Sequence, residues 1–319
     1  MKVLINAKIS DQQMEELQQL SSQLELVREL DPQKAREAMR EAEIIFTFRL
    51  PGPLEEAGNL RWIQLVSAGA DHIMEAGVGK TDILVTTASG IHGAAMAEYT
   101  LCMMVMLARR IPMIMKESQQ KQWKPSRLRT YYGDELYGKT LGIVGFGAIG
   151  QRVAKVAKAL DMKVLGLRRS GRSGGGEDGA DELFGPDELL AMLPRCDFVL
   201  VAVPYTKETR GLIGERELRA MKPTAHLINV ARGEIVDEAA LAKALREGWI
   251  AGGAFDVFAK EPLPPESELW DLPNLIITPH IAGNTIPYMD RAAELFKENL
   301  RRYLVGEPML NVLDKQLGY

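Results

Sequence analysis

Three polar side chains follow predicted strands in the second half of the sequence, and together they could reduce a carbonyl group. Arg232 comes directly after the strand pattern LINVA, Glu261 follows GAFDVF, and His280 follows LIITP. The carboxyl ends of parallel strands meet at one edge of a sheet, where open α/β sheets bind their ligands. Taken singly, each residue also fits a structural role, as a strand-end ion pair, a surface acid or a loop histidine. Their joint occurrence favours chemistry.

The three residue types suit the reduction of a 2-oxo acid. A histidine can deliver a proton to the carbonyl oxygen near neutral pH, and a neutral histidine can act as base in the reverse direction. A carboxylate beside the histidine favours its protonated form and fixes the orientation of the ring. An arginine can hold the substrate carboxylate and polarise the carbonyl group. The reaction then needs a hydride donor.

A glycine-rich turn upstream indicates which cofactor donates the hydride. Gly145-x-Gly147-x-x-Gly150 stands between the strand pattern KTLGIVGFG and the helix pattern AIGQRVAKVAKALD. In a dinucleotide-binding fold the first glycine makes a tight turn, the second lets the backbone approach the pyrophosphate, and the third allows close helix–strand packing. The start of the helix, with Ala148 and Ile149, offers free N–H groups to the phosphates. We therefore predict a nicotinamide dinucleotide site.

The next strand lacks the acidic residue that usually binds the ribose 2′-hydroxyl of NAD. Arg168, Arg169 and Ser170 follow the strand pattern MKVLGL, whereas the nearest acid, Asp161, lies before it. The planar guanidinium group suits phosphate oxygens, and the serine hydroxyl can add a hydrogen bond. The same residues could instead be solvated charges on a loop that continues into the glycine-rich patch SGRSGGGEDG. We interpret them as a site for the 2′-phosphate and predict a preference for NADPH.

The elements that must position these residues form two alternating series. The first has strand patterns and helix patterns at 2–7, 11–23, 24–30, 32–42, 43–48, 61–69 and 83–89. A helix pattern over 94–122 is broken at Pro112. The second series has strand patterns at 139–147, 162–169, 197–204, 225–231, 250–258 and 275–283, with helices such as 148–161 and 237–248 between them. Such alternation predicts α/β domains with parallel sheets.

We assign residues 1–99 and 285–319 to one domain and residues 100–284 to the other. The last helix pattern, 290–307, is expected to pack on the first domain because the second sheet is already complete before it. His226 opens a predicted strand and is interpreted as structural.

The composition argues against several classes of protein. The chain has 319 residues and a formal net charge of −4, so no general attraction to nucleic acid or to an anionic membrane is expected. Cys102 and Cys196 lie in apolar contexts, which argues against a disulfide framework and favours the cytoplasm. The start of the chain has the pattern of a strand rather than a signal peptide, and the apolar run 101–108 is too short to span a bilayer. We identify no set of metal ligands.

These motifs resemble those of the D-isomer-specific 2-hydroxyacid dehydrogenases over almost the whole chain. The resemblance rests on ELYGKTLGIVGFGAIGQRVAK, VPYTKETRGLIG, KPTAHLINVARGEIVDEAALAKAL, GAFDVFAKEPLP and NLIITPHIAG, which occur in the order of the family's signature blocks. VSAGADHI and AAMAEYTLCMMVMLARR resemble its substrate-domain loop and interdomain helix. The resemblance implies two doubly wound parallel-sheet domains: a flavodoxin-like substrate domain made from both chain ends and an inserted Rossmann domain. It also implies a cleft that closes by hinge motion and a homodimer.

The resemblance further implies roles for individual residues of the reaction site. Arg232 would bind the substrate carboxylate and carbonyl, Glu261 would pair with the histidine, and His280 would be the acid/base. Backbone N–H groups around Ala68 and Gly69 would receive the substrate carboxylate.

Other residues are implied to border the cofactor or the substrate. Asp256 would contact the nicotinamide amide, and the cofactor cleft would be lined by Val203, Pro204, Thr209, Val230 and Ala231. Phe48, Arg49 and Leu50 would border the pocket for the substrate side chain. Arg49 either reaches the substrate carboxylate or faces solvent, and the sequence leaves both open.

Within this family, a sequence with arginine in place of the acid resembles those of the NADPH-linked glyoxylate and hydroxypyruvate reductases and related 2-oxoacid reductases. We therefore expect an oxidoreductase that uses NADPH, with NAD as a possible second cofactor, on a small 2-oxo acid. The alternative enzyme is an NAD-linked dehydrogenase of the phosphoglycerate or formate type, against which the arginines argue. The alternative outside enzymes is a dinucleotide-sensing binding protein, such as a corepressor that docks peptides; no peptide groove is evident in the sequence.

Overall fold

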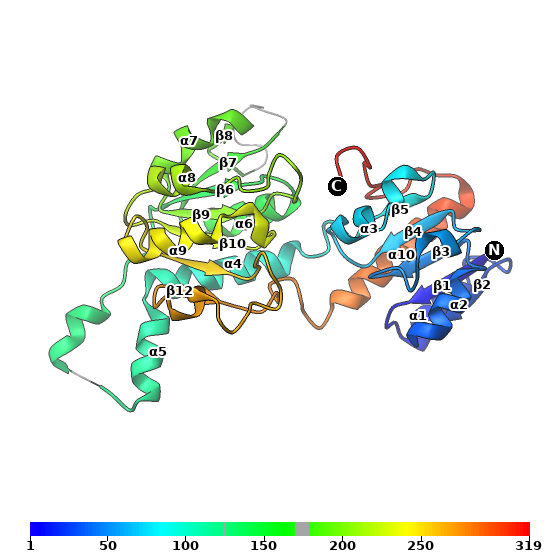
Figure 1. Cartoon of the computed structure of the whole chain (residues 1–319), viewed down its shortest axis with the longest axis horizontal. Helices are drawn as coiled ribbons and strands as arrows, with labels where there is room; N and C mark the ends of the chain where they lie inside the picture. The colour runs from blue at the N-terminus through cyan, green and yellow to red at the C-terminus, as the bar shows by residue number, and fades with distance from the viewer. Residues whose placement is uncertain (124, 170–178) are drawn as a thin grey trace. The chain divides into compact units, whose positions relative to one another are not determined.

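The computed structural model describes residues 1–123, 125–169 and 179–319, and these residues form two units. Unit 1 contains Met1–His92 and Thr285–Tyr319, and unit 2 contains Gly93–Asn284 (Figure 1). The expected boundary between residues 99 and 100 falls inside helix α4 (Gly93–Ala108), so the division lies at the start of that helix instead. The reason is packing, because α4 buries its methionines and alanines in the core of unit 2.

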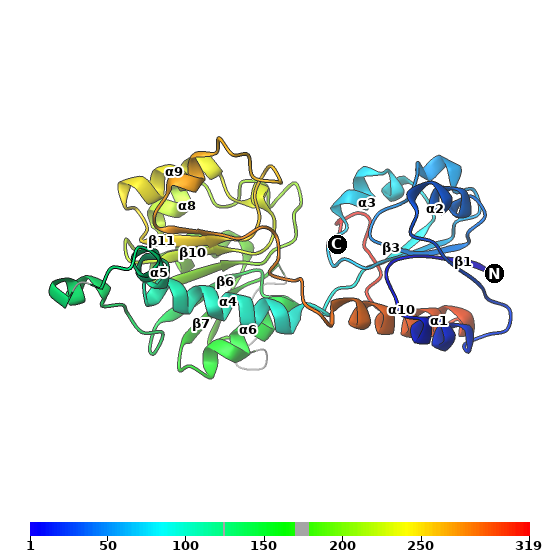
Figure 2. The same ribbon diagram turned by 90° about the horizontal axis from the view of Figure 1, so that it is seen from below.

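Unit 1 contains a parallel sheet with helices on both faces (Figure 2). Its five described strands lie in the order β2-β1-β3-β4-β5, with bounds Glu25–Arg28, Lys2–Asn6, Ile44–Thr47, Trp62–Leu65 and Leu84–Thr86. One face is covered by α1 (Asp11–Gln18) and α10 (Tyr288–Val305), and the other by α2 (Pro32–Met39) and α3 (Asp71–Glu75). The expected return of the last helix to the first domain is confirmed.

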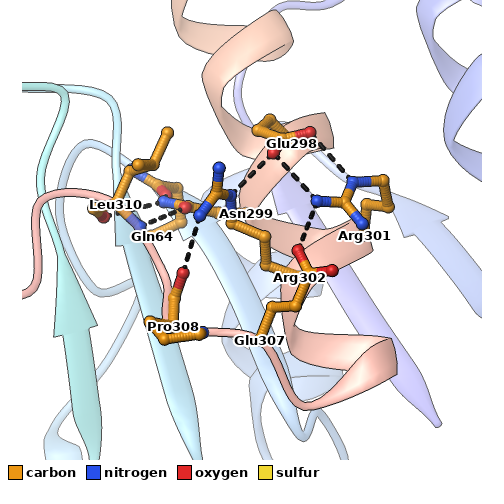
Figure 3. A network of polar contacts seen from close by, with 8 residues as sticks. All are labelled: Gln64, Glu298, Asn299, Arg301, Arg302, Glu307, Pro308 and Leu310. Carbon is orange, nitrogen blue, oxygen red and sulfur yellow. Dashed lines mark hydrogen bonds and ion pairs between the residues drawn. The ribbon is translucent and has the colours of Figure 1, made fainter.

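Polar contacts of the buried Asn299 fix the C-terminal tail to unit 1 (Figure 3). The fully buried Asn299 donates to Oε1 of Gln64 at 2.9 Å and to the carbonyl of Leu310 at 3.1 Å, and its own Oδ1 accepts the Leu310 N–H at 2.7 Å. Beyond these contacts the tail pairs with the edge of the sheet, where the N–H of Leu313 donates to the carbonyl of Val85 at 2.8 Å. Helix α10 and the tail therefore complete the core of unit 1.

Unit 2 contains a parallel sheet whose seven described strands lie in the order β12-β11-β10-β9-β6-β7-β8. The helices α4 and α6 (Ala148–Lys158) cover one face, and α8 (Glu215–Ala220) and α9 (Glu238–Glu247) cover the other (Figures 1 and 2). The bounds of the strands, listed from β12 to β8 in the order of the sheet, are Leu275–Ile277, Gly252–Phe255, His226–Asn229, Phe198–Val201, Thr140–Val144, Lys163–Leu167 and Glu182–Phe184. The strand order reverses between β6 and β9, which is the point at which doubly wound sheets bind ligands.

One strand of unit 2 differs from the sequence analysis. Strand β8 was not predicted, since its three residues stand alone after the glycine-rich patch and carry too little pattern to be recognised. The predicted break near Pro112 is confirmed: Arg110 adopts a left-handed conformation with φ 54°, and α5 (Ile111–Gln119) begins with Pro112 in its first turn.

Helix α5 and the 3-10 helix Pro125–Tyr131 extend away from the sheet of unit 2 (Figure 1). Several large apolar side chains of this segment are exposed, namely Met115, Trp123, Leu128 and Tyr132. Within the described residues, every helix is either too short or too polar to cross a lipid bilayer.

Candidate active site

The residues expected to carry chemistry follow three neighbouring strands of unit 2. Asn229, Phe255 and Ile277 stand opposite one another as the last residues of β10, β11 and β12. Because the strands are parallel, the segments that follow them emerge at the same edge of the sheet. Arg232, Asp256, Glu261 and His280 all lie on these segments.

His280 and Glu261 form a hydrogen-bonded pair. Nδ1 of His280 lies 2.7 Å from Oε2 of Glu261, and the second carboxylate oxygen, Oε1, accepts the N–H of Phe258 at 3.0 Å. The backbone contact fixes the carboxylate, which in turn fixes the ring. The two side chains are 49% and 35% exposed, so the pair is open to a ligand. Since Nδ1 is occupied by Glu261, Nε2 is the ring nitrogen available for a substrate.

Arg232 is placed by a close approach between two loops. A Cβ atom on the next residue, Gly233, would lie 1.8 Å from the carbonyl carbon of Phe258, so only glycine allows the loop after β10 to pack on the loop after β11. The Arg232 carbonyl accepts Nδ2 of Asn229 at 2.9 Å, and Nη1 of Arg232 donates to the Ala231 carbonyl at 2.8 Å. The loop that carries Arg232 thus contacts the loop that carries Glu261.

Asp256 is buried and holds the segment around His280. Its Oδ1 accepts the hydroxyl of Thr278 at 2.6 Å and the N–H of Ile281 at 2.9 Å, and its Oδ2 accepts the N–H of Ala282 at 2.8 Å. Its backbone carbonyl accepts the N–H of His280 at 2.8 Å. The contact of Asp256 with the nicotinamide amide stays a prediction, and the carboxylate already has these three donors.

The sequence analysis did not single out two residues that contact this segment. Thr278 follows the last residue of β12, a position that sequence reasoning could have recognised as a strand end. Tyr99, on α4, brings its hydroxyl to 2.6 Å from Oγ1 of Thr278. No sequence signal points to Tyr99, because 179 residues separate the two partners.

The glycine turn after β6 has the geometry of a phosphate cradle. Gly145 has φ 108°, and a Cβ there would lie 2.5 Å from the backbone of Ala202. A Cβ on Gly150 would lie 2.6 Å from the Gly145 carbonyl oxygen, which is the close helix–strand packing expected of the third glycine. Gly147 instead faces open space, with nothing within 4 Å of its Cβ position. The exposed Gly147 and the N-terminal N–H groups of α6 fit an approaching pyrophosphate.

Arg168 and Arg169 follow β7, next to this turn. The N–H of Arg168 donates to the Phe184 carbonyl at 3.1 Å, and Arg169 is exposed. The pKa of Glu208 is lowered, first by the hydroxyl of Thr206 and in smaller part by the charge of Arg169. The loop after β9 is therefore within electrostatic reach of Arg169. Ser170 lies outside the described residues.

The other residues expected to line the cofactor cleft also follow strands of this sheet. After β9, Val203 is partly buried and Pro204 exposed, and Thr209 closes the loop by donating to the Pro204 carbonyl at 2.7 Å. After β10, the N–H of Val230 donates to the Val201 carbonyl and that of Ala231 to Oδ1 of Asn229. These two N–H groups are therefore engaged within the chain.

The residues expected to bind substrate from the first domain lie in unit 1. Ala68 and Gly69 are partly buried beyond the end of β4, and within the described part of the chain their N–H groups find no acceptor. Arg49 is exposed, with its guanidinium carbon 5.8 Å from the ring centroid of Phe48. The Phe48 ring also stacks on His72 at 5.3 Å, and Nε2 of His72 lies 2.6 Å from the Phe48 carbonyl oxygen.

Comparison with known proteins identifies the family. Residues 101–282 match the NAD binding domain of D-isomer specific 2-hydroxyacid dehydrogenases. The chain belongs to this family. It is 37% identical over 298 residues to a glyoxylate reductase of Thermococcus gammatolerans, covering 91% of this chain and 88% of that protein.

Solved structures of family members have the same fold. A D-isomer specific 2-hydroxyacid dehydrogenase family protein from Aeromonas salmonicida is 33% identical, with a TM-score of 0.87 over 98% of this chain and 99% of that one. A dehydrogenase from Xanthobacter autotrophicus, solved in complex with NADPH and MES, is 30% identical, with a TM-score of 0.83 over 100% and 99% of the two chains. The predicted fold class and family are confirmed, and this oxidoreductase has a domain that binds a nicotinamide dinucleotide.

Proposed function

We propose that this dehydrogenase reduces small 2-oxo acids, with glyoxylate and hydroxypyruvate as the leading substrates, and prefers NADPH as the reductant. The observation that carries the proposal is the hydrogen-bonded pair of His280 and Glu261, which follows the strands of a nicotinamide-binding sheet. The similarity to glyoxylate reductases supports the choice of substrate.

In this proposal His280 is the acid that completes the reduction. Glu261 holds Nδ1, so Nε2 delivers its proton to the carbonyl oxygen, and the 2-oxo acid becomes a 2-hydroxy acid. In the reverse direction the neutral ring takes the hydroxyl proton at the same nitrogen. Arg232 binds the substrate carboxylate and polarises the carbonyl group. A bound nicotinamide supplies the hydride in one direction and accepts it in the other.

The cofactor is held by the glycine turn and the arginines after β7. Gly145, Gly147 and Gly150 let the backbone and the start of α6 receive the pyrophosphate. Arg168 and Arg169 stand where an NAD enzyme has an acid, and they pair with the 2′-phosphate of NADPH. The NADPH in the related Xanthobacter autotrophicus structure supports this assignment.

We extend the proposal to the substrate contacts of unit 1. The N–H groups of Ala68 and Gly69 receive the substrate carboxylate, because they have no acceptor among the described residues. Arg49 remains a candidate for the same anion, and its exposed position also suits a solvated charge.

We also propose that the protein is a cytoplasmic homodimer. The exposed apolar side chains of the segment around α5 support a self-association surface, with Trp123 85% and Tyr132 67% exposed. The two free cysteines fit a reducing compartment. Light scattering of the purified protein tests the dimer, and a monomer at micromolar concentration contradicts it.

Steady-state kinetics test the function. Glyoxylate, hydroxypyruvate, pyruvate and a longer 2-oxo acid are each assayed with NADPH and with NADH. We expect turnover of the two smallest substrates and a higher kcat/KM for NADPH. An equal or higher kcat/KM for NADH contradicts the cofactor assignment. Tight NADPH binding without turnover of any of these substrates contradicts the proposed enzymatic activity and favours a dinucleotide-sensing protein.

A further inference from the structure

A chain of two hydroxyl groups connects α4 to the segment that carries His280. Oγ1 of Thr278 donates to Oδ1 of Asp256 at 2.6 Å. A hydroxyl has one proton, so Thr278 can only accept from Tyr99, whose hydroxyl lies 2.6 Å from the same Oγ1. The hydrogen bonds therefore run in one direction, from Tyr99 to Thr278 to Asp256.

Asp256 connects these two hydroxyl groups to the residues on both sides of His280. The carboxylate binds Thr278 two residues before the histidine and the N–H groups of Ile281 and Ala282 after it. The carbonyl of Asp256 binds the N–H of His280 itself. His280 has φ 54°, a left-handed conformation that a residue with a side chain adopts only when its surroundings impose it.

Tyr99 is suited to a permanent donor role. Its burial raises the pKa of the hydroxyl to about 12, so the proton stays in place at physiological pH. Tyr99 lies on α4, the first element of unit 2, and α4 packs on α6 through the core. Tyr99, the first donor in this series of hydrogen bonds, is therefore held by a well-packed helix.

We propose that Tyr99 and Thr278 are positioning residues for His280. Through Asp256 they hold the loop of His280 in the conformation in which Nδ1 faces Glu261. Neither hydroxyl takes part in proton transfer, and their effect is on the alignment of the ring. The inference rests on the proposed role of His280 as acid/base.

Substitutions that remove one hydroxyl at a time test the proposal. Thr278→Val keeps the shape of the side chain and removes the donor, and Thr278→Ser restores it. We expect Thr278→Val to lower kcat for glyoxylate with NADPH by roughly tenfold to a hundredfold, the range of a small misalignment. Thr278→Ser should recover most of this loss, and Tyr99→Phe should lower kcat by a smaller factor. The KM for glyoxylate and the Kd for NADPH should stay close to wild type in all three variants.

Thr100→Val is the matched control. Thr100 is the neighbour of Tyr99 on α4, is fully buried, and donates its hydroxyl to the Met96 carbonyl at 2.7 Å, outside the chain of Tyr99 and Thr278. This variant should keep the kcat of the wild type. An equal loss of kcat in Thr100→Val overturns the proposal, because a general disturbance of α4 then explains the effect. An unchanged kcat in Thr278→Val, or no recovery in Thr278→Ser, also overturns it.

His280→Ala separates this inference from the proposed function. If His280→Ala keeps full activity, the acid/base role itself fails. If His280→Ala is inactive while Thr278→Val has the kcat of the wild type, only the positioning role fails. Thermal unfolding of each variant establishes that the compared proteins are folded.

Discussion

Nδ1 of His280 lies 2.7 Å from Oε2 of Glu261, although 19 residues separate them in the chain. The two residues follow neighbouring parallel strands, so the sheet brings them to one edge. The carboxylate is itself fixed by the N–H of Phe258. This arrangement leaves one ring nitrogen for the substrate and fixes its direction, which is the requirement for a general acid.

Removal of the histidine should abolish most of the activity. We expect His280→Ala to lower kcat/KM for glyoxylate by about 10²–10⁴-fold, the usual contribution of a general acid, with the Kd for NADPH unchanged. Glu261→Gln should cause a smaller loss, because the ring stays in place but loses its charged partner. Steady-state kinetics and cofactor fluorescence measure both effects. Glu266→Gln, an exposed acid on the same loop, is the control and should have no effect. Full activity of His280→Ala would refute the role of the histidine.

The arginine after β7 should set the cofactor preference. Arg168→Ser removes a charged partner of the 2′-phosphate, worth about 1.5–3 kcal/mol, so kcat/KM with NADPH should fall roughly tenfold or more. The value with NADH should change little, since NADH has no phosphate at this position. Arg216→Ser, an exposed arginine on α8, is the matched control. Equal losses with both cofactors would show that Arg168 supports the fold rather than the phosphate.

The close approach of two loops makes Gly233 indispensable. A Cβ there would lie 1.8 Å from the Phe258 carbonyl carbon, so Gly233→Ala must push the Arg232 loop away from the Glu261 loop. We expect a loss of stability of about 1–3 kcal/mol, as for other overpacked sites, together with a large loss of kcat/KM. Urea unfolding and kinetics measure the two effects. Gly58→Ala, at a position with open space around the Cβ, should be neutral in both assays. Wild-type behaviour of Gly233→Ala would contradict the described packing.

His226 should make the stability of the protein depend on pH. Burial lowers the pKa of its ring to about 4 from the ordinary 6.5. Between these values the unfolded chain binds a proton that the folded protein does not. The free energy of unfolding therefore decreases as the pH falls from about 6.5 to about 4. His226→Phe preserves a ring against Phe198, on which the imidazole stacks at 5.3 Å, and removes the titration.

The free energy of unfolding of His226→Phe relative to wild type should therefore rise by about 2 kcal/mol between pH 7.5 and pH 4.5. Urea unfolding of both proteins at the two pH values measures this difference. If the two proteins lose stability in parallel, His226 does not titrate in the expected way.

The contacts of the buried Asn299 in Figure 3 should hold the C-terminal tail. Asn299→Ala leaves the backbone N–H and carbonyl of Leu310 without this partner, whereas Oε1 of Gln64 keeps the hydroxyl of Thr86 at 2.7 Å. A buried polar group left unsatisfied costs about 1–3 kcal/mol. We expect a lower unfolding midpoint and faster proteolysis of the tail beyond Pro308. Asn59→Ala, at an exposed position, is the control. Unchanged stability of Asn299→Ala would show that the other contacts of the tail, such as those of Arg302 with Pro308 and of Asn311 with Ser89, hold it without Asn299.

Much of the fold could be predicted from local pattern. Strand and helix patterns separated by short turns predicted the main strands of both sheets, and the helix of the glycine motif was found because its strand, turn and helix are contiguous. Strand β8 was missed because three residues carry too little pattern. The expected boundary at residues 99 and 100 falls inside α4, because the sequence shows that this helix is apolar but not which core it joins.

The sequence by itself determined the residue types, their order and their position after successive strands, and these predict Arg232, Glu261 and His280 as a set. The tertiary structure alone decided which atoms meet. The bond between His280 and Glu261, the close approach of Gly233 to Phe258 and the hydroxyl contact between Tyr99 and Thr278 all join residues distant in the chain. Local propensity carries no information about such pairs, because the register of the sheet and the packing of α4 fix them only when the whole unit has folded.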